Sequence, residues 1–305
     1  MRLAETAVGP PGAAPLFDAE IESQLQRAWE VRVRHHPMEL DCCDPSRTGV
    51  VSVTGSWCAL NCAHCGGRYL RGMTPPGELG DLMRRRPSSW LVSGGCDPSG
   101  RVPVAEHQDL LRRLRRCGPV NLHVGLIPAE EAAAVAPLVD AISFDLLADG
   151  RTIREVTGLT CGPETYFATY DLLRACARVK PHICIGIRGG GPSGEERALE
   201  FLARRGAEEV IFIVFIPTPG TRYQHRPPPD LKRVVEVLCA ARTMLPRARL
   251  KLGCMRPRGR YRALLDLLAV RSGFNSIVRP TAAARRLAST LGLHLVEREG
   301  CCALW

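Results

Sequence analysis

At residues 50–65 the chain reads VVSVTGSWCALNCAHC. Its first part, Val50–Thr54, is rich in β-branched residues, which suits a buried parallel strand. Three cysteines, Cys58, Cys62 and Cys65, follow at spacings of four and three residues. Three thiolates from one loop can converge on a metal centre and leave one ligand position open. Structural zinc normally closes its shell with four ligands, so this loop predicts a reactive centre.

Strand-like runs of this kind recur along the chain and alternate with helical patterns, without a linker-like break. This alternation predicts an α/β fold with a (β/α)8 TIM-type barrel or an open partial barrel. Active sites of such barrels lie at the carboxyl ends of the strands, where the cysteine loop falls. The eight predicted strands are Val50–Thr54, Trp90–Ser93, Val120–Val124, Ala141–Asp145, Ile183–Ile187, Val210–Ile216, Arg249–Gly253 and Asn275–Val278.

The ends of the chain are expected to extend this barrel. Residues 1–48 form an N-terminal extension, in which the first 16 or so are predicted to be disordered and Asp18–His35 to be helical. Residues 49–282 form the barrel itself. Residues 283–305 form a C-terminal helix followed by a Cys-Cys tail, which is expected to lie over the barrel mouth.

The composition narrows the possible functions of the 305 residues. An apolar content of 45% excludes global disorder, and the longest apolar stretch, Val210–Ile216, is too short to span a membrane. No secretory signal is visible, so we expect a cytoplasmic protein without membrane association. Disulfides are then not expected, and the 14 cysteines indicate metal or redox chemistry instead.

The net charge of +10 comes from 41 basic residues, of which three are lysines. Arginine runs such as Arg84–Arg86 fit solvated helix faces, although they could also meet an acidic partner. Aromatic residues make up 5% of the chain, which leaves few stacking platforms for single strands, so nucleic-acid binding is not expected. A basic zinc protein that binds nucleic acid remains the alternative from a different class.

The spacing of the three cysteines after the first strand resembles the radical SAM superfamily. That resemblance implies a 4Fe–4S cluster on Cys58, Cys62 and Cys65, with S-adenosylmethionine (SAM) chelating the fourth iron. The sequence departs from the superfamily in having His64 where an aromatic residue is usual, and Cys96 where a glutamate is usual. The residues that the resemblance implies for binding SAM are His64, Ser93, Gly94, Gly95 and Asp145.

A closer resemblance is to the biotin and lipoyl synthase group, in particular to the biotin-synthase homologues that form one component of two-protein lipoyl synthases. It is carried by Gly55–Cys62, Phe215–Thr221, Gly253–Pro257 and the terminal Cys301-Cys302 pair. It implies a second, auxiliary iron–sulfur cluster, the sulfur source of such enzymes. Its expected ligands are Cys96, Cys254, Cys301 and Cys302, with Cys184, Cys42 and Cys43 as reserves.

The resemblance implies an enzyme that cleaves SAM reductively and inserts sulfur into an unactivated C–H bond. The expected substrate is an octanoyl group on a lipoyl carrier domain, whose acidic surface would suit the basic chain. A second radical SAM subunit and an electron donor such as ferredoxin or flavodoxin are the further partners expected. The alternatives within the group are biotin formation and metallocofactor maturation, because the same SAM motifs serve all of these reactions.

Overall fold

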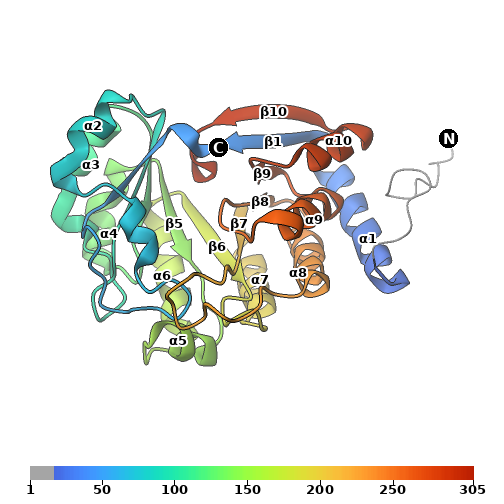
Figure 1. The fold of residues 1–305 in the computed structure, drawn as a ribbon, viewed down its shortest axis with the longest axis horizontal. Helices are drawn as coiled ribbons and strands as arrows, with labels where there is room; N and C mark the ends of the chain where they lie inside the picture. The colour runs from blue at the N-terminus through green and yellow to red at the C-terminus, as the bar shows by residue number, and fades with distance from the viewer. Residues whose placement is uncertain (1–16) are drawn as a thin grey trace.

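The computed structural model describes residues 17–305, and its ten parallel strands form one continuous sheet (Figure 1). The disorder predicted for the first 16 residues falls outside the described residues. Strands β2 to β9 lie side by side in chain order, and the full order is β10-β1-β9-β8-β7-β6-β5-β4-β3-β2. Among the described residues β2 and β10 are the two edges and do not pair with each other, so the curled sheet is an open partial barrel. The predicted fold class is confirmed.

The strands are β1 (Glu39–Asp44), β2 (Thr48–Ser52), β3 (Ser89–Ser93), β4 (Val120–His123), β5 (Ala141–Asp145), β6 (Val179–Ile185), β7 (Glu209–Val214), β8 (Arg249–Leu252), β9 (Ser276–Val278) and β10 (His294–Glu299). The helices are α1 (Ala19–His35), α2 (Leu79–Arg84), α3 (Gln108–Arg115), α4 (Ala129–Val135), α5 (Gly150–Thr157), α6 (Pro163–Cys176), α7 (Glu195–Arg204), α8 (Leu231–Met244), α9 (Gly259–Arg271) and α10 (Ala282–Thr290). A short 3-10 helix, η6 (Cys302–Leu304), ends the chain.

All eight predicted strands are present, but the sequence did not reveal β1 and β10. Strand β1 pairs with β9 on one side and with β10 on the other, from Glu39 opposite His294 to Asp44 opposite Glu299. Neither strand carries the β-branched, apolar pattern of the others, and they depend on pairing with each other and with β9. Both ends of the chain therefore add strands to the same sheet.

Alternate residues of the strands point to opposite faces of the sheet. The face toward the helices is apolar and carries residues such as Trp90, Leu122, Phe144, Phe212 and Leu250, all at most 1% exposed. The inner, concave face is polar instead. Its buried side chains include Ser89, Asn121, Ser143, Lys180, His182, Lys251 and Ser276.

Helix α1 covers the outside of the barrel at α8 and α9. Its Ile21, Leu25 and Ala28 pack with Val235, Cys239 and Leu268 in a small apolar cluster. Asp18 caps the helix by accepting a hydrogen bond from the main-chain N of Ile21 at 3.1 Å. Near the other end, Arg32 is buried and donates to the main-chain oxygens of Pro37 and Glu39 at 2.7 and 2.5 Å. These contacts join α1 to the start of β1.

The C-terminal segment, residues 300–305, lies within the concave side of the sheet and not over the barrel mouth, where the sequence led us to expect it. The main-chain N of Cys301 donates to Ser89 Oγ, on the first residue of β3, at 3.2 Å. Lys251 Nζ donates to the main-chain oxygen of Cys302 at 3.0 Å. The pairing of β10 with β1 delivers the segment to the open side of the barrel (Figure 1), and the polar inner face supplies its hydrogen-bond partners.

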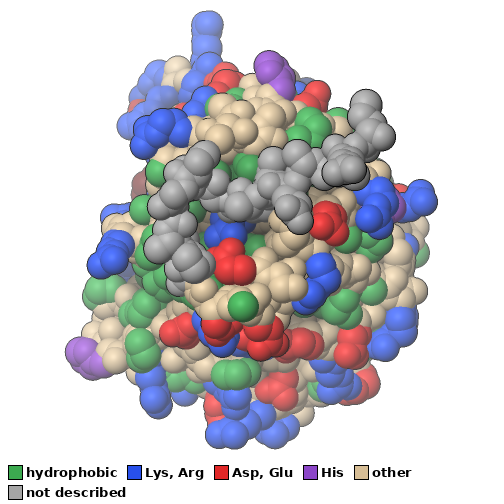
Figure 2. Space-filling view, turned by 90° about the vertical axis from the view of Figure 1, so that its right-hand side faces the viewer, with side chains coloured by type: hydrophobic (Ala, Val, Ile, Leu, Met, Phe, Trp, Pro, Cys, Tyr) green, Lys and Arg blue, Asp and Glu red, His purple; other side chains and the backbone are tan. Residues whose placement is uncertain are grey.

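The outer surface carries charges of both signs. Figure 2 shows basic and acidic side chains interspersed on the face it presents, with acidic residues gathered in its lower half among basic ones. The excess of positive charge is therefore not concentrated on this face. Within residues 17–305 there is no helix with both the length and the apolarity required to cross a bilayer.

A buried ion pair fixes the loop that follows β8. Arg256 donates to Asp266 of α9 at 2.8 and 3.3 Å, to the Gly253 oxygen at 2.6 Å and to the Val278 oxygen at 2.7 Å. Asp266 also accepts from the main-chain N of Thr281 at 3.0 Å. Since Arg256 is 3% exposed, it is not available to a docking partner.

Replacing Asp266 with Asn should destabilise the protein by about 3–5 kcal/mol, because it leaves the buried Arg256 without a counter-charge. The free energy of unfolding in urea measures this effect. The exposed Arg258, two residues along the same loop, provides the control: Arg258→Ala should stay within about 0.5 kcal/mol of the parent protein. Equal stability of the two variants would contradict a structural role for the ion pair.

Candidate active site at the carboxyl ends of the strands

The cysteine loop is anchored to the ends of β2 and β3 by the side chain of Thr54. Its Oγ1 accepts a hydrogen bond from the Gly95 main-chain N at 2.7 Å and donates to the Trp57 oxygen at 2.9 Å. The main-chain N of Ala59 donates to the Cys96 oxygen at 2.8 Å. The loop that carries Cys58 is thereby held against the segment that follows β3.

The middle of the loop turns tightly around Ala63, which is fully buried. Asn61 has a left-handed backbone with φ +45°, and the main-chain N of Gly66 donates to the Cys62 oxygen at 2.8 Å. Ala63 itself is held from two sides, by the Val156 oxygen at 2.7 Å and by the main-chain N of Tyr223 at 3.1 Å. The turn brings Cys62 and Cys65 to the same side of the loop.

The thiols of Cys62 and Cys65 lie close enough to influence each other's pKa. This contact lowers the pKa of Cys65 to about 7 and, together with burial, raises the pKa of Cys62. Cys58, Cys62 and Cys65 are all partly exposed. A thiolate is the form that binds metal, and one member of the trio reaches it readily near neutral pH.

The packing of the loop against Gly95 allows no side chain at that position. A Cβ on Gly95 would lie 1.8 Å from the Trp57 oxygen and 2.6 Å from Cys58 Cβ. The backbone of β3's end and the cysteine loop therefore form a cradle that fits a cluster bound by three thiolates. Among residues 17–305 no three His, Cys, Asp or Glu side chains are placed to hold a single metal ion.

His64 lies inside this cradle. Its Nδ1 is shielded from solvent and has no hydrogen-bond partner among the described residues. Burial lowers the pKa of His64 to about 4, so its ring stays neutral. An unpartnered buried nitrogen is costly, and a ligand atom bound at this end of the barrel would supply the partner.

Asp145, the last residue of β5, lies at the same end of the sheet with its side chain exposed to the barrel mouth. Burial lowers the pKa of His64, His123 and His182, and the Asp145 carboxylate opposes this shift at each of them. The rings of His123 and His182 lie 5.3 Å apart on neighbouring parts of the inner face. The expected SAM-binding residues therefore gather around one end of the barrel: His64, Ser93, Gly94, Gly95 and Asp145.

The cysteines expected to hold a second cluster divide into two places. Cys96 follows Gly95, and its pKa is raised to about 12 by burial and by the nearby thiol of Cys58. Cys96 therefore lies next to the cysteine loop. Burial and then the Cys301 thiol raise the pKa of Cys254, and contact with Cys301 together with burial raises the pKa of Cys302. Cys96 thus lies at the carboxyl end of β3, whereas Cys301 is bonded to the first residue of that strand, Ser89, and to Asn121 of β4.

The remaining reserve cysteines differ in direction. Cys43 is buried and packs with Cys302, Ala303, Ile211 and Val278 on the inner face. Cys42, its neighbour in β1, points to the other face, where the charges of Arg285 and Glu297 influence its pKa. Cys184 of β6 faces inward, and its pKa is raised by burial and then by Asp145 and Glu195.

Sequence reasoning missed the polar residues of the inner face below the mouth. Lys180 and Lys251 both pair with Glu209, and burial lowers their pKa values to about 7 and about 8. Asn121 accepts from Ser143 Oγ at 2.9 Å and donates from Nδ2 to Cys301 Sγ at 3.5 Å. Their spacing in the sequence could have identified them, because Lys180, His182 and Cys184 occur at every second position of an otherwise apolar strand.

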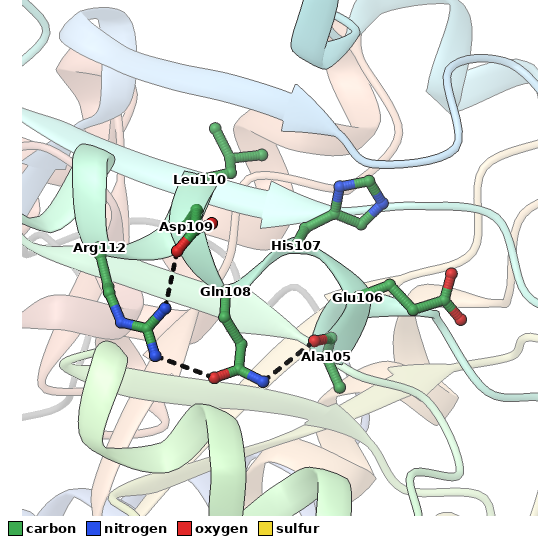
Figure 3. A pocket seen from close by; sticks show the side chains of 7 residues that line it. All are labelled: Ala105, Glu106, His107, Gln108, Asp109, Leu110 and Arg112. Carbon is green, nitrogen blue, oxygen red and sulfur yellow. Dashed lines mark hydrogen bonds and ion pairs between the residues drawn. The ribbon is translucent and has the colours of Figure 1, made fainter.

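A separate surface hollow lies on the outside of the barrel at the start of α3 (Figure 3). Its side chains bond to one another: Arg112 donates to Asp109 at 2.8 Å and to Gln108 at 3.1 Å, and Gln108 donates to the Ala105 oxygen at 3.3 Å. None of the expected site residues lines it.

A parallel partial barrel with a three-cysteine loop at the carboxyl end of its first barrel strand defines the class of radical SAM proteins. No family model matches the chain. The chain is 24% identical to a biotin synthase of Halorhodospira halophila (strain DSM 244 / SL1), over 96% of this chain and 95% of that protein. Over nearly its whole length the chain is thus similar to a biotin synthase, which agrees with the resemblance to the radical SAM superfamily and its biotin synthase group found in the sequence.

Two crystal structures share the fold. Methylornithine synthase (PylB) superposes with a TM-score of 0.66 at 14% identity, covering 92% of this chain and 91% of that one. HydG, a maturase of the FeFe hydrogenase, superposes with a TM-score of 0.67 at 12% identity, covering 92% of this chain and 69% of that one. The fold of the barrel is thus shared with proteins of different named activities.

Gly95→Ala should lower the rate of reductive SAM cleavage by about 10²-fold, because the new Cβ would push the loop away from the geometry that joins its thiolates. The measurement is 5′-deoxyadenosine formed under a strong reductant, with Cys62→Ala as the variant expected to form none. Gly77→Ala is the matched control, since a Cβ there meets no atom within 4 Å. Wild-type turnover by the Gly95→Ala protein would show that the cradle is not required.

Proposed function

We propose that this radical SAM enzyme of the biotin synthase group inserts sulfur into an unactivated C–H bond of an octanoyl group on a lipoyl carrier domain, as one component of a lipoyl synthase. The observation that carries the proposal is the pair of separate thiol groups in one barrel. Cys58, Cys62 and Cys65 lie on the loop after the carboxyl end of β2, whereas Cys301 and Cys302 lie on the inner face, where Cys301 is bonded to Ser89 and Asn121 and Cys302 packs with Cys43.

The first thiol group fits the 4Fe–4S cluster expected of the superfamily. When bound, that cluster supplies the electron that cleaves SAM and generates the radical that abstracts hydrogen. The chain's own residues would hold and orient the reactants. Gly94 and Gly95 allow a close approach of SAM to the backbone, His64 offers an unpartnered ring nitrogen, and Asp145 offers a carboxylate at the mouth.

The second thiol group fits an auxiliary iron–sulfur cluster, whose chemistry would be to provide the sulfur atom. Of its four expected ligands, Cys301 and Cys302 lie together on the inner face, Cys254 lies exposed on the loop after β8, and Cys96 lies beside the first group. A substrate chain that passes between the two groups would meet hydrogen abstraction on one wall and sulfur on the other. Since burial by the surrounding sheet limits water, side reactions of the carbon radical would be suppressed.

The rim of the mouth suits an acidic, acylated carrier. Within residues 17–305 four large apolar side chains are exposed, and two of them, Trp57 on the cysteine loop and Tyr69 just after it, are 54% and 39% exposed. Exposed arginines surround them on the loops that follow β2, β7 and β8. These are Arg71, Arg222, Arg226 and Arg258. Arginines around exposed aromatic side chains provide electrostatic steering together with an apolar contact.

Two further partners complete the proposal. An electron donor such as ferredoxin or flavodoxin would reduce the first cluster, and a second radical SAM subunit would make the other C–S bond. The runner-up function, biotin formation, is favoured by the full-length similarity to the Halorhodospira halophila biotin synthase. Metallocofactor maturation is a third possibility within the group and is supported by the fold shared with HydG.

The substrate is tested by offering the protein, with reductant and SAM, either octanoylated carrier domain or desthiobiotin and following product mass. The carrier should gain sulfur, and raised ionic strength should slow the reaction, because exposed charges are screened beyond about 10 Å at 0.1 M salt. Sulfur in desthiobiotin with an unchanged carrier would assign the protein to biotin formation.

A charge reversal at the rim of the mouth tests where the carrier docks. Arg226→Glu should raise the KM for the carrier by about tenfold, because it places a negative charge where the acidic carrier docks. Arg204, exposed at the end of α7 on the other side of the barrel, is the control position, and Arg204→Glu should leave that KM unchanged. Equal KM values for the two variants would argue against docking at the mouth.

A further inference from the structure

The C-terminal segment is held inside the barrel by a buried lysine. Lys251 Nζ, on a side chain 1% exposed, donates to the main-chain oxygens of Cys302 and Trp305 and contacts Glu209 Oε2 at 3.4 Å. Both main-chain oxygens belong to the segment that carries the thiol pair. The ammonium group of Lys251 therefore bonds the segment to β8 at two points.

The other buried lysine serves as a comparison within the same network. Lys180, whose side chain is 4% exposed, pairs with Glu209 of β7, and within residues 17–305 it makes no hydrogen bond to the C-terminal segment. It shares the environment and the counter-charge of Lys251, but only Lys251 bonds the segment's main chain. The protein has three lysines, and the third, Lys232, lies on the surface and pairs with Asp18.

Two further contacts orient the segment at its first thiol. Ser89 Oγ accepts from the main-chain N of Cys301 at 3.2 Å, and Asn121 donates to Cys301 Sγ at 3.5 Å. The side chains of Cys302 and Ala303 then pack against Cys43 of β1. Cys43 Sγ lies 3.3 Å from Ser276 Oγ, on the same inner face.

We propose that Lys251 is a positioning residue that clamps residues 301–305 inside the barrel, and that the clamp gathers Cys301 and Cys302 with Cys43 into one thiol site. Cys43, from an edge strand, thereby takes the place that the sequence suggested for Cys96. The thiol grouping itself is a property of the folded chain. Its use as the auxiliary iron–sulfur site rests on the proposed function.

The clamp is tested without metal, by labelling the metal-free protein with N-ethylmaleimide under argon and locating the label by mass spectrometry. Lys251→Met should speed labelling of Cys301 and Cys302 by about tenfold or more, because the released segment opens to solvent. Cys239, buried between α1, α8 and α9, is the internal reference and should stay protected in every variant. Lys180→Met is the matched control and should leave Cys301 protected.

Two outcomes overturn the clamp. One is unchanged labelling of Cys301 and Cys302 in Lys251→Met, and the other is equal release by Lys180→Met, which would mean that the network as a whole and not Lys251 holds the segment. If Lys251→Met does not fold, a chain shortened by Ala303–Trp305 replaces it. That chain loses η6 and the Trp305 contact to Lys251, so the proposal requires the same exposure of the thiol pair.

The assignment of Cys43 is tested by iron content after reconstitution. Two clusters correspond to about eight irons per chain, and Cys43→Ala should lower the value to about four while the first cluster remains. Cys239→Ala is the matched control, since Cys239 is also a buried thiol beside a serine hydroxyl, with Sγ 3.7 Å from Ser272 Oγ. About eight irons in Cys43→Ala would overturn its assignment.

The two proposals fail separately. A wild-type chain that binds only about four irons would remove the second cluster from the proposed function. The labelling experiment would still decide the clamp, because it involves no metal. Conversely, full iron loading of the Lys251→Met chain would overturn the link between the clamp and the site, even with two clusters present.

Discussion

The reactive end of this protein depends on one close contact, the packing of the Trp57–Cys58 backbone against Gly95. A Cβ at Gly95 would lie 1.8 Å from the Trp57 oxygen, so the two strand ends can meet only through a glycine. Thr54 completes the contact by bonding both partners. Because the loop is held in this way, three thiols, a neutral histidine and the carboxylate of Asp145 face the same end of the barrel.

A second constraint is the polarity of the concave face. Buried lysines and amides are tolerated only when they are paired, since an unpaired buried charge is strongly destabilising. Glu209 meets both Lys180 and Lys251, and the main-chain oxygens of the C-terminal segment satisfy the remaining donors of Lys251. The same pairing that makes the interior stable brings Cys301 and Cys302 inside. Stability and the proposed second site therefore share their contacts.

Two groups of thiols lie on one curled sheet. The first comes from β2 and β3, and the second from the segment after β10 together with β1. Proteins that share the fold, such as methylornithine synthase and HydG, are named for different activities. The distinguishing features of this chain are accordingly its inner polar face, its thiols beyond the common loop, and the arginines and aromatics at its mouth.

The sequence by itself determined the eight barrel strands, their parallel order and the cysteine loop, because each is encoded in neighbouring residues whose spacing and polarity can be read locally. It did not reveal β1 and β10, since Glu39–Asp44 and His294–Glu299 lack a strong strand pattern and are stabilised by each other and by β9. For the same reason it placed Cys96 with Cys301 and left Cys43 in reserve. Which thiols meet depends on the edge pairing of two distant segments and on the bonds that Lys251 makes to the end of the chain, and only the tertiary structure decides these.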